Sequence, residues 1–292
     1  MVAPAGPVPR DAFDAGAAIL GARYTLVHDD RIFARQGYLA GDDDARAAEL
    51  SRALADPTIA GVFCARGGYG LMRILARLDA AAFARAPKLV VGFSDVTALH
   101  AWAAHAGVVS LHGPVVTQLG KLPAEDAASL FALAEATSPA PPLTGLRAIG
   151  GGSASQPGAA VEGPLVGGNL EVLSRLVGTP WALSLDGAIL FLEEIGERPY
   201  RIDRQLTQLE LAGALPRLAG VVVGDLVGCA EKDGSAPDAE TVLVERLGRR
   251  GIPIVAGAPI GHGSRNRAIP HGARVRLDPA AGSLEFLEPA VS

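Results

Sequence analysis

Apolar and polar positions alternate along the first half of the chain as a layered α/β protein requires. Three apolar runs have strand length and composition: Tyr24–His28, Gly61–Ala65 and Lys88–Phe93. Segments with the helical spacing of apolar residues lie at 45–55, 71–78 and 95–107. Apolar strands joined by helices predict a parallel sheet that is covered on both faces. We therefore expect a doubly wound, Rossmann-like first domain over residues 1–136.

The composition changes between residues 137 and 160, where Pro, Gly, Ser and Ala dominate. Such enrichment predicts a linker or an irregular crossover, not a packed element. Beyond it, residues 161–292 again alternate strand-like and helical runs and end on two β-like runs, ARVRLD and SLEFLE. This pattern predicts a β-rich α/β C-terminal domain. Two domains also predict a cleft between them, where small ligands usually bind.

Composition and charge narrow the class of protein. Of the 292 residues, 49% are apolar, 20% are charged and 5% are aromatic, which is typical of a soluble globular protein. The net charge of −5 disfavours nucleic acid as a partner. The two cysteines, Cys64 and Cys229, form neither a disulfide framework nor a zinc motif. The N-terminus lacks a basic secretory region and no window is apolar enough for a membrane span, so we expect a cytoplasmic protein.

Ser94 lies in GFSDVT, where a predicted strand ends and a predicted helix begins. This position presents a hydroxyl at the carboxyl edge of a sheet, beside the amides of a helix N-terminus. The amide of Asp95 is then placed to donate to a developing oxyanion. A serine here can equally be a simple helix N-cap. The segment also lacks the GxSxG spacing of the α/β-hydrolases, so it does not decide between the two roles alone.

The Gly-rich segment RGGYG, residues 66–70, follows another predicted strand. Its glycines permit close approach of the backbone to a ligand and expose amide donors. The segment lacks both the Walker lysine and the GxGxxG spacing of nucleotide-binding loops. A second oxyanion donor or a carboxylate-binding nest fits it, and so does a plain strand-to-helix turn.

A serine nucleophile requires a base and an acidic group that orients the base. Among six histidines, His262 follows a strand and enters a Gly-rich loop, where catalytic residues tend to lie. The acidic candidates Glu193, Glu194 and Glu197 end an apolar strand. Side chains alternate along a strand, so only one of the first two can point into a given cleft. The alternative is an acidic strand end that is paired with nearby arginines.

Taken in order, these segments closely resemble the LD-carboxypeptidases, a family of serine peptidases also called muramoyltetrapeptide carboxypeptidases. The resemblance spans roughly residues 37 to 278. The matching segments are GYLAGDD, CARGGYG, GFSDVTALH, LHGP, GPLVGGNLEVLSRLVGTP, LEEIGERPYRIDRQLTQL and GAPIGHGSRNRAIPHG. The resemblance implies a Rossmann-like nucleophile domain and a smaller β-rich C-terminal domain. It implies Ser94 as nucleophile, Glu193 as triad acid with Glu197 as the alternate, and His262 as base.

The resemblance also implies the reaction. Family members release the terminal D-alanine from the murein tetrapeptide during peptidoglycan recycling, without a metal or cofactor, and are typically homodimers. The amides of Asp95 and Gly68 are the candidate oxyanion donors, and Arg66, Gly67 and Arg201 are candidates for binding the substrate carboxylate. One alternative is a related peptidase that cleaves a peptidyl-nucleotide amide in antibiotic self-immunity. A remote alternative is a non-catalytic α/β protein that binds an anion.

Overall fold

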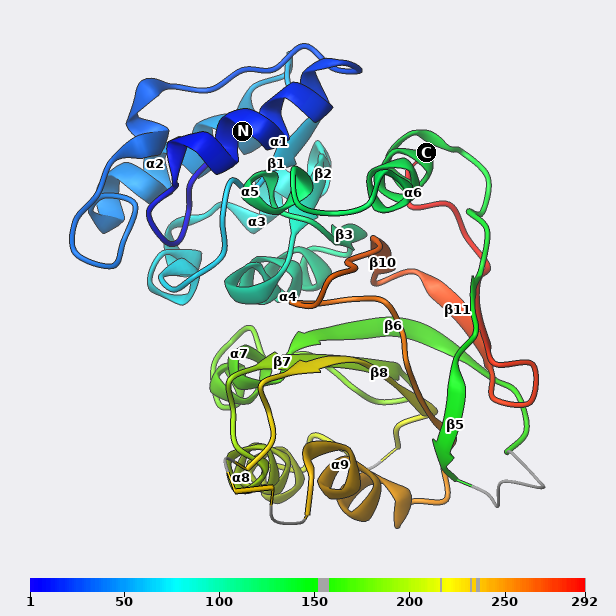
Figure 1. Cartoon of the computed structure of the whole chain (residues 1–292). Helices are drawn as coiled ribbons and strands as arrows, with labels where there is room; N and C mark the ends of the chain where they lie inside the picture. The colour runs from blue at the N-terminus through cyan, green and yellow to red at the C-terminus, as the bar shows by residue number, and fades with distance from the viewer. Residues whose placement is uncertain (152–157, 216, 232, 235–236, 292) are drawn as a thin grey trace. The chain divides into compact units, whose positions relative to one another are not determined.

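The computed structural model describes residues 1–151, 158–215, 217–231, 233–234 and 237–291 (Figure 1). The chain divides into two compact units. The first comprises Met1–Glu135, Asn266–Pro270 and Val291, and the second comprises Ala136–Arg265 and His271–Ala290. Both are mixed α/β, as predicted, and the second is the β-rich one. It is not smaller than the first, because the segment from 136 to 160 belongs to it.

The first unit is built on a four-stranded sheet in the order β1-β2-β3-β10. Neighbours β1 and β2, and β2 and β3, pair in parallel, which agrees with the predicted parallel sheet. Its strands are β1 (Gly61–Phe63), β2 (Leu89–Gly92), β3 (Ser110–His112) and β10 (Ile269–His271). Its helices are α1 (Arg10–Gly21), α2 (Asp43–Ala55), α3 (Ala80–Arg85), α4 (Thr97–His105), α5 (Val116–Leu119) and α6 (Ala124–Glu135).

Two local predictions in this unit are wrong. Residues Tyr24–His28 form no strand. Val27 is 57% exposed, so this run has no buried face that would hold it in a sheet. The position beside β1 is instead occupied by Val2, whose amide donates to the Phe63 carbonyl at 3.1 Å. The segment 71–78 forms two short 3-10 helices, Leu71–Arg73 and Leu75–Arg77, in place of one α-helix.

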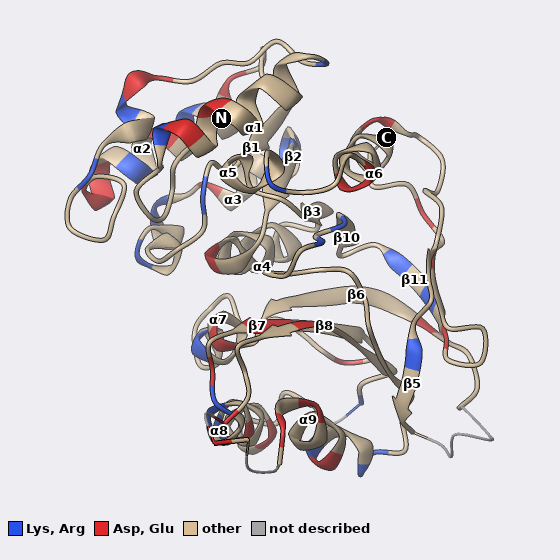
Figure 2. Ribbon diagram, viewed as in Figure 1, with Lys and Arg blue, Asp and Glu red and all other residues tan. Residues whose placement is uncertain are grey.

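The second unit is built on an eight-stranded sheet in the order β4-β12-β11-β6-β7-β8-β9-β5. Its centre, β6 to β9, is parallel, and β11 and β12 add antiparallel pairs at one side. The strands are β4 (Leu143–Thr144), β5 (Arg147–Gly150), β6 (Val161–Asn169), β7 (Ile189–Ile195), β8 (Gly220–Val227), β9 (Ile254–Ala256), β11 (Arg274–Asp278) and β12 (Ser283–Phe286). The helices are α7 (Leu170–Leu176), α8 (Pro199–Leu211) and α9 (Ala239–Gly248). The neighbouring strands β7 and β8 carry acidic residues within otherwise apolar runs (Figure 2).

The predicted linker contains packed structure. Strand β4 pairs with β12 through Leu143 and Leu284, and β5 pairs with β9. Leu143 is buried, so this segment contributes to the core. The expectation of an irregular crossover is therefore wrong for residues 143–150, whereas residues 152–157 lie outside the described part of the chain.

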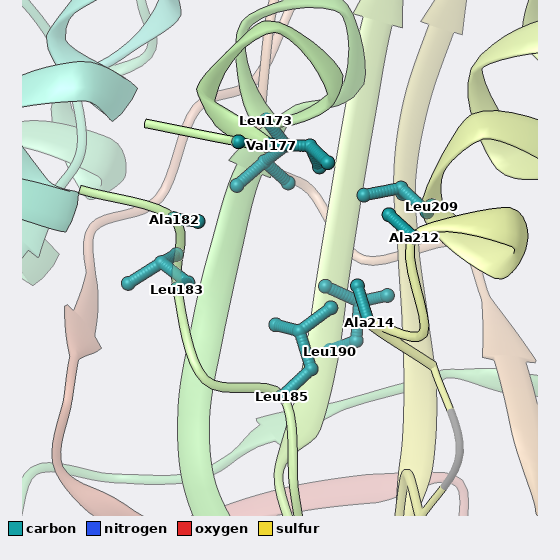
Figure 3. Close-up of a pocket in the computed structure, with 10 residues that line it drawn as sticks. Leu173, Val177, Ala182, Leu183, Leu185, Leu190, Leu209, Ala212 and Ala214 are labelled. Carbon is teal, nitrogen blue, oxygen red and sulfur yellow. The ribbon is translucent and has the colours of Figure 1, made fainter. Parts of the chain in front are cut away.

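An apolar cavity of about 230 Å³ lies within the second unit. Figure 3 shows the aliphatic side chains that line it, among them Leu173 of α7, Leu190 of β7 and Leu209 of α8. None of the described residues that line it carries a titratable side chain. None of the described helices is both long enough and apolar enough to cross a membrane.

Candidate active site

Ser94 occupies a strained turn at the carboxyl end of β2. Phe93 is extended, and Ser94 begins a 3-10 helix, Ser94–Val96, that runs directly into α4. Ser94 has φ of 66°, and no other non-glycine residue in the described chain has a positive φ. Backbone strain of this kind concentrates at functional sites, and a serine on a sharp strand-to-helix turn is exposed for nucleophilic attack. An ordinary N-cap residue has extended φ and ψ, so the positive φ of Ser94 is not explained by helix capping.

The Gly-rich loop after β1 packs on this serine. A Cβ added to Gly67 would lie 2.8 Å from the Ser94 Cβ. The next residue, Gly68, has φ of +112° and lies against Gly6, whose amide donates to the Gly67 carbonyl at 3.0 Å. Arg66 donates from Nη1 to the Pro7 carbonyl at 2.5 Å, so its guanidinium is already engaged with the N-terminal segment. Gly67 therefore lies against the nucleophile because it lacks a side chain, and Gly68 lies against the N-terminal segment at Gly6 for the same reason.

Asp95 connects the turn to the same loop through its side chain, a role that the sequence did not reveal. Its buried carboxylate accepts from the amide of Leu71 at 2.9 Å. Burial raises the pKa of Asp95 to about 6, against the opposing effect of hydrogen bonds from the amides of Leu71 and Gly70. The backbone amide of Asp95 is among the first amides of the helix, which have no partner within it. The Asp95 side chain thus fixes the loop, and its backbone amide has no acceptor within the helix.

In the second unit, His262 pairs with Glu193. The Nδ1 atom of His262 lies 2.7 Å from Oε2 of Glu193. Glu193 is completely buried near the end of β7, and the His262 side chain is 17% exposed. A carboxylate in this position accepts the Nδ1 proton and leaves Nε2 as the basic nitrogen. The pair therefore has the base and orienter geometry that a serine hydrolase uses.

The two other glutamates of β7 and its turn have different partners. Glu194 accepts hydrogen bonds from Asn169 Nδ2 at 2.9 Å and from the backbone amides of Glu171 and Ile195 at 2.8 Å. Burial raises the pKa of Glu194 to about 7, although those hydrogen bonds oppose the shift. Glu194 thus joins the end of β7 to the start of α7, and among the three glutamates Glu193 is the one paired with His262.

Arg201, a candidate for the substrate carboxylate, forms an exposed ion pair with Glu197 at 3.4 Å. Its Nε also donates to the hydroxyl of Tyr200 at 3.2 Å. Arg201 and Glu197 are therefore paired with each other at the surface. Neither residue is paired with His262 in this arrangement.

Comparison with known proteins decides the family. The chain matches the model of the LD-carboxypeptidase N-terminal domain over residues 1–113 and that of the LD-carboxypeptidase C-terminal domain over residues 162–277. This chain belongs to the LD-carboxypeptidase family. It is therefore a serine-type carboxypeptidase, a hydrolase.

The relatives agree with this membership. The chain is 40% identical to a Synechocystis protein whose assignment as a carboxypeptidase is itself provisional, covering 90% of this chain and 85% of that protein. It is 33% identical to the murein tetrapeptide carboxypeptidase of Pseudomonas aeruginosa, covering 95% and 92%. The crystal structure of muramoyltetrapeptide carboxypeptidase from Oxalobacter formigenes superimposes with a TM-score of 0.83 at 31% identity, covering 98% and 96%.

A second kind of relative shares the fold. The microcin C7 self-immunity protein of Escherichia coli is 26% identical, covering 94% of this chain and 88% of that protein. A structure of a microcin C7 self-immunity protein in complex with glutamyl sulfamoyl guanosine superimposes with a TM-score of 0.88 at 22% identity, covering 100% and 96%. At that identity the superposition shows a common fold, and it carries no conclusion about the substrate of this chain.

Proposed function

We propose that this LD-carboxypeptidase releases the terminal D-alanine of the murein tetrapeptide, with Ser94, Glu193 and His262 as its catalytic triad. The observation that carries the proposal is the 2.7 Å contact between Glu193 and His262, because it provides an oriented base. The strained turn at Ser94 supports the assignment of the nucleophile. The murein tetrapeptide carboxypeptidase of Pseudomonas aeruginosa supports the choice of substrate.

The proposed mechanism is a two-step acyl transfer. His262 takes the Ser94 proton on Nε2 as the hydroxyl oxygen attacks the carbonyl of the scissile bond. Glu193 holds the imidazole by its Nδ1 proton and stabilises the imidazolium. The imidazolium then gives its proton to the nitrogen of the leaving D-alanine as the C–N bond breaks. Water, deprotonated by His262, finally hydrolyses the Ser94 ester and restores the enzyme.

The amides of Asp95 and Gly68 are proposed to stabilise the tetrahedral oxyanion. A single donor of this kind typically lowers the barrier by about 3 kcal/mol. The substrate carboxylate is proposed to bind to the backbone at Gly67, with Arg66 beside it. Arg201 is the weaker candidate, because it is paired with Glu197.

The cellular setting is part of the proposal. A cytoplasmic enzyme that recycles peptidoglycan would act on small muropeptides, with no nucleic acid or membrane as partner. A homodimer is proposed on the resemblance to the family, and sedimentation of the purified chain tests it.

The direct test is release of D-alanine from L-Ala–D-Glu–meso-diaminopimelyl–D-Ala, measured for the wild type and Ser94→Ala. We expect release by the wild type and none by the variant, with identical circular dichroism. Release that persists in the variant would remove Ser94 from the mechanism. Absence of release by the folded wild type would refute the substrate.

A second candidate function is hydrolysis of a peptidyl-nucleotide amide, which the 26% identity to the microcin C7 self-immunity protein of Escherichia coli supports. Measurement of kcat/KM for the tetrapeptide and for an aminoacyl sulfamoyl nucleoside distinguishes the two functions. Under our proposal kcat/KM for the tetrapeptide is the larger. Preference for the nucleoside conjugate would support the second candidate.

A further inference from the structure

Strands β7 and β8 change register at Glu193. The parallel pairing runs up to Leu192 opposite Val223 and resumes at Glu194 opposite Leu226. One residue of β7 therefore faces two residues of β8. This is a β-bulge, which is a feature that re-aims side chains and is common beside active sites.

The two bulged residues are Gly224 and Asp225, and Asp225 bonds twice to the loop that carries His262. Its backbone amide donates to the Ile260 carbonyl at 2.9 Å. Its carboxylate accepts from the Gly263 amide at 3.0 Å. Asp225 thus holds this loop on both sides of His262 in the sequence.

Glycines on the loop allow this close contact. A Cβ at Gly263 would lie 2.3 Å from Oδ2 of Asp225. A Cβ at Gly261, which has φ of +117°, would lie 2.8 Å from Oε2 of Glu193. Real side chains do not approach so closely, so the loop is held between two carboxylates, one from each strand. His262 lies between these two glycines.

The charge of Asp225 acts on the same imidazole. Burial raises the pKa of the half-buried Asp225, the Gly263 amide lowers it, Glu193 raises it and His262 lowers it. Glu193 on β7 and His262 on the loop are the ionisable groups whose charges act on it. A negative charge near an imidazole favours its protonated form.

We propose that Asp225 is a positioning residue for His262, which fixes the loop through the Gly263 amide and adds a second negative charge that stabilises the imidazolium. The proposal rests on the proposed role of His262 as the base. The sequence of β8 predicts only an apolar strand. The proposal gives this strand a residue that acts on the site.

Two substitutions separate the hydrogen bond from the charge. Asp225→Asn keeps an oxygen that accepts from Gly263 and removes the charge, whereas Asp225→Ala removes both. We expect Asp225→Asn to lower the pKa of His262, which a pH titration of the imidazole followed by NMR would measure. The acidic limb of the pH profile of kcat/KM should shift to lower pH. The value of kcat should fall roughly tenfold. Asp225→Ala should fall further, by about 10²-fold, because the imidazole is also misplaced.

The matched control is Asp186→Asn, which removes a carboxylate of the same unit that pairs with Arg217 at the surface. It should leave the His262 titration and kcat unchanged. An unaltered His262 pKa in Asp225→Asn would overturn the proposal. The NMR titration needs no turnover, so a shifted pKa in a protein that cleaves no muropeptide would uphold the role of Asp225 and refute only the substrate. If Asp225→Ala does not fold, Asp225→Asn alone decides.

Discussion

Gly67 lies directly against Ser94: a methyl group on its Cα would come 2.8 Å from the Cβ and 3.0 Å from the Oγ of the serine. The Phe93 carbonyl, 3.3 Å from the same point, leaves this methyl group little room to move away. Gly67 does not have a positive φ, so alanine is acceptable to the backbone at this position. The constraint on Gly67 is therefore the space that the serine occupies.

Gly67→Ala should lose at least about 10²-fold in kcat/KM, because a displaced hydroxyl no longer meets its base and oxyanion donors. Steady-state release of D-alanine measures the loss, and circular dichroism checks the fold. Gly21→Ala in α1 is the matched control, since its new methyl group meets only Leu26 at an ordinary 3.5 Å. Equal activity of both variants would show that the loop can move away from Ser94 without consequence.

The positive φ of Ser94 predicts a conflict between stability and activity. An L-residue in the left-handed region is strained by about 1–2 kcal/mol, whereas glycine adopts it freely but loses more backbone entropy on folding. Both Ser94→Ala and Ser94→Gly should be inactive. Ser94→Gly should be the more stable of the two, by about 0.5–1 kcal/mol in urea unfolding. Coincident unfolding curves would show that the turn carries no strain.

Glu193→Gln should lower kcat by on the order of 10³- to 10⁴-fold, because the amide cannot stabilise the imidazolium and can select the wrong tautomer. The protein should remain folded, since the amide is nearly the same shape as the carboxyl. Glu197→Gln, which breaks only a surface pair with Arg201, should change kcat little. The opposite ranking of the two variants would transfer the triad role to Glu197.

Local sequence was enough to indicate the turn at Ser94, because a strand, a turn and a helix follow one another within a few residues. The choice among Glu193, Glu194 and Glu197 was not readable from residue spacing, since it depends on which side chain reaches a loop almost seventy residues away. The role of Asp225 depends on a bulge between β7 and β8, and a change of register has no signature in the sequence of one strand.

The segment 143–150 illustrates the same limit. Leu143 pairs with Leu284, and Arg147 pairs with Ala256, so both strands form only when partners from far along the chain are present. Strand preference is largely set by such neighbours, which explains why a Pro- and Gly-rich composition was misleading here. The run Tyr24–His28 is the opposite case, with strand-forming residues but no buried face.

His100 provides a prediction of pH dependence. Its ring is completely buried, with Nε2 2.8 Å from the Gly92 carbonyl and Nδ1 2.8 Å from the Ser110 hydroxyl. A carbonyl only accepts, so Nε2 carries the proton and Nδ1 accepts from Ser110. Burial lowers the pKa of His100 to about 4, although the hydrogen bond to Gly92 opposes the shift. The folded protein therefore keeps this histidine neutral.

In the unfolded chain the same histidine titrates near 6.5. Between about pH 6.5 and pH 4 the unfolded state thus binds one more proton than the folded state, and the free energy of unfolding falls as the pH is lowered, by about 1.4 kcal/mol per unit. His100→Gln retains a donor and an acceptor, but it should lack this pH-dependent contribution to the free energy of unfolding. Urea unfolding at pH 7 and pH 5 should show the wild type losing about 2 kcal/mol more than the variant. Glu194, with its raised pKa, contributes the opposite slope, but it is common to both proteins and cancels in the difference. Equal losses would mean that His100 binds its proton at the same pH in the folded and the unfolded protein, so that its burial does not lower its pKa.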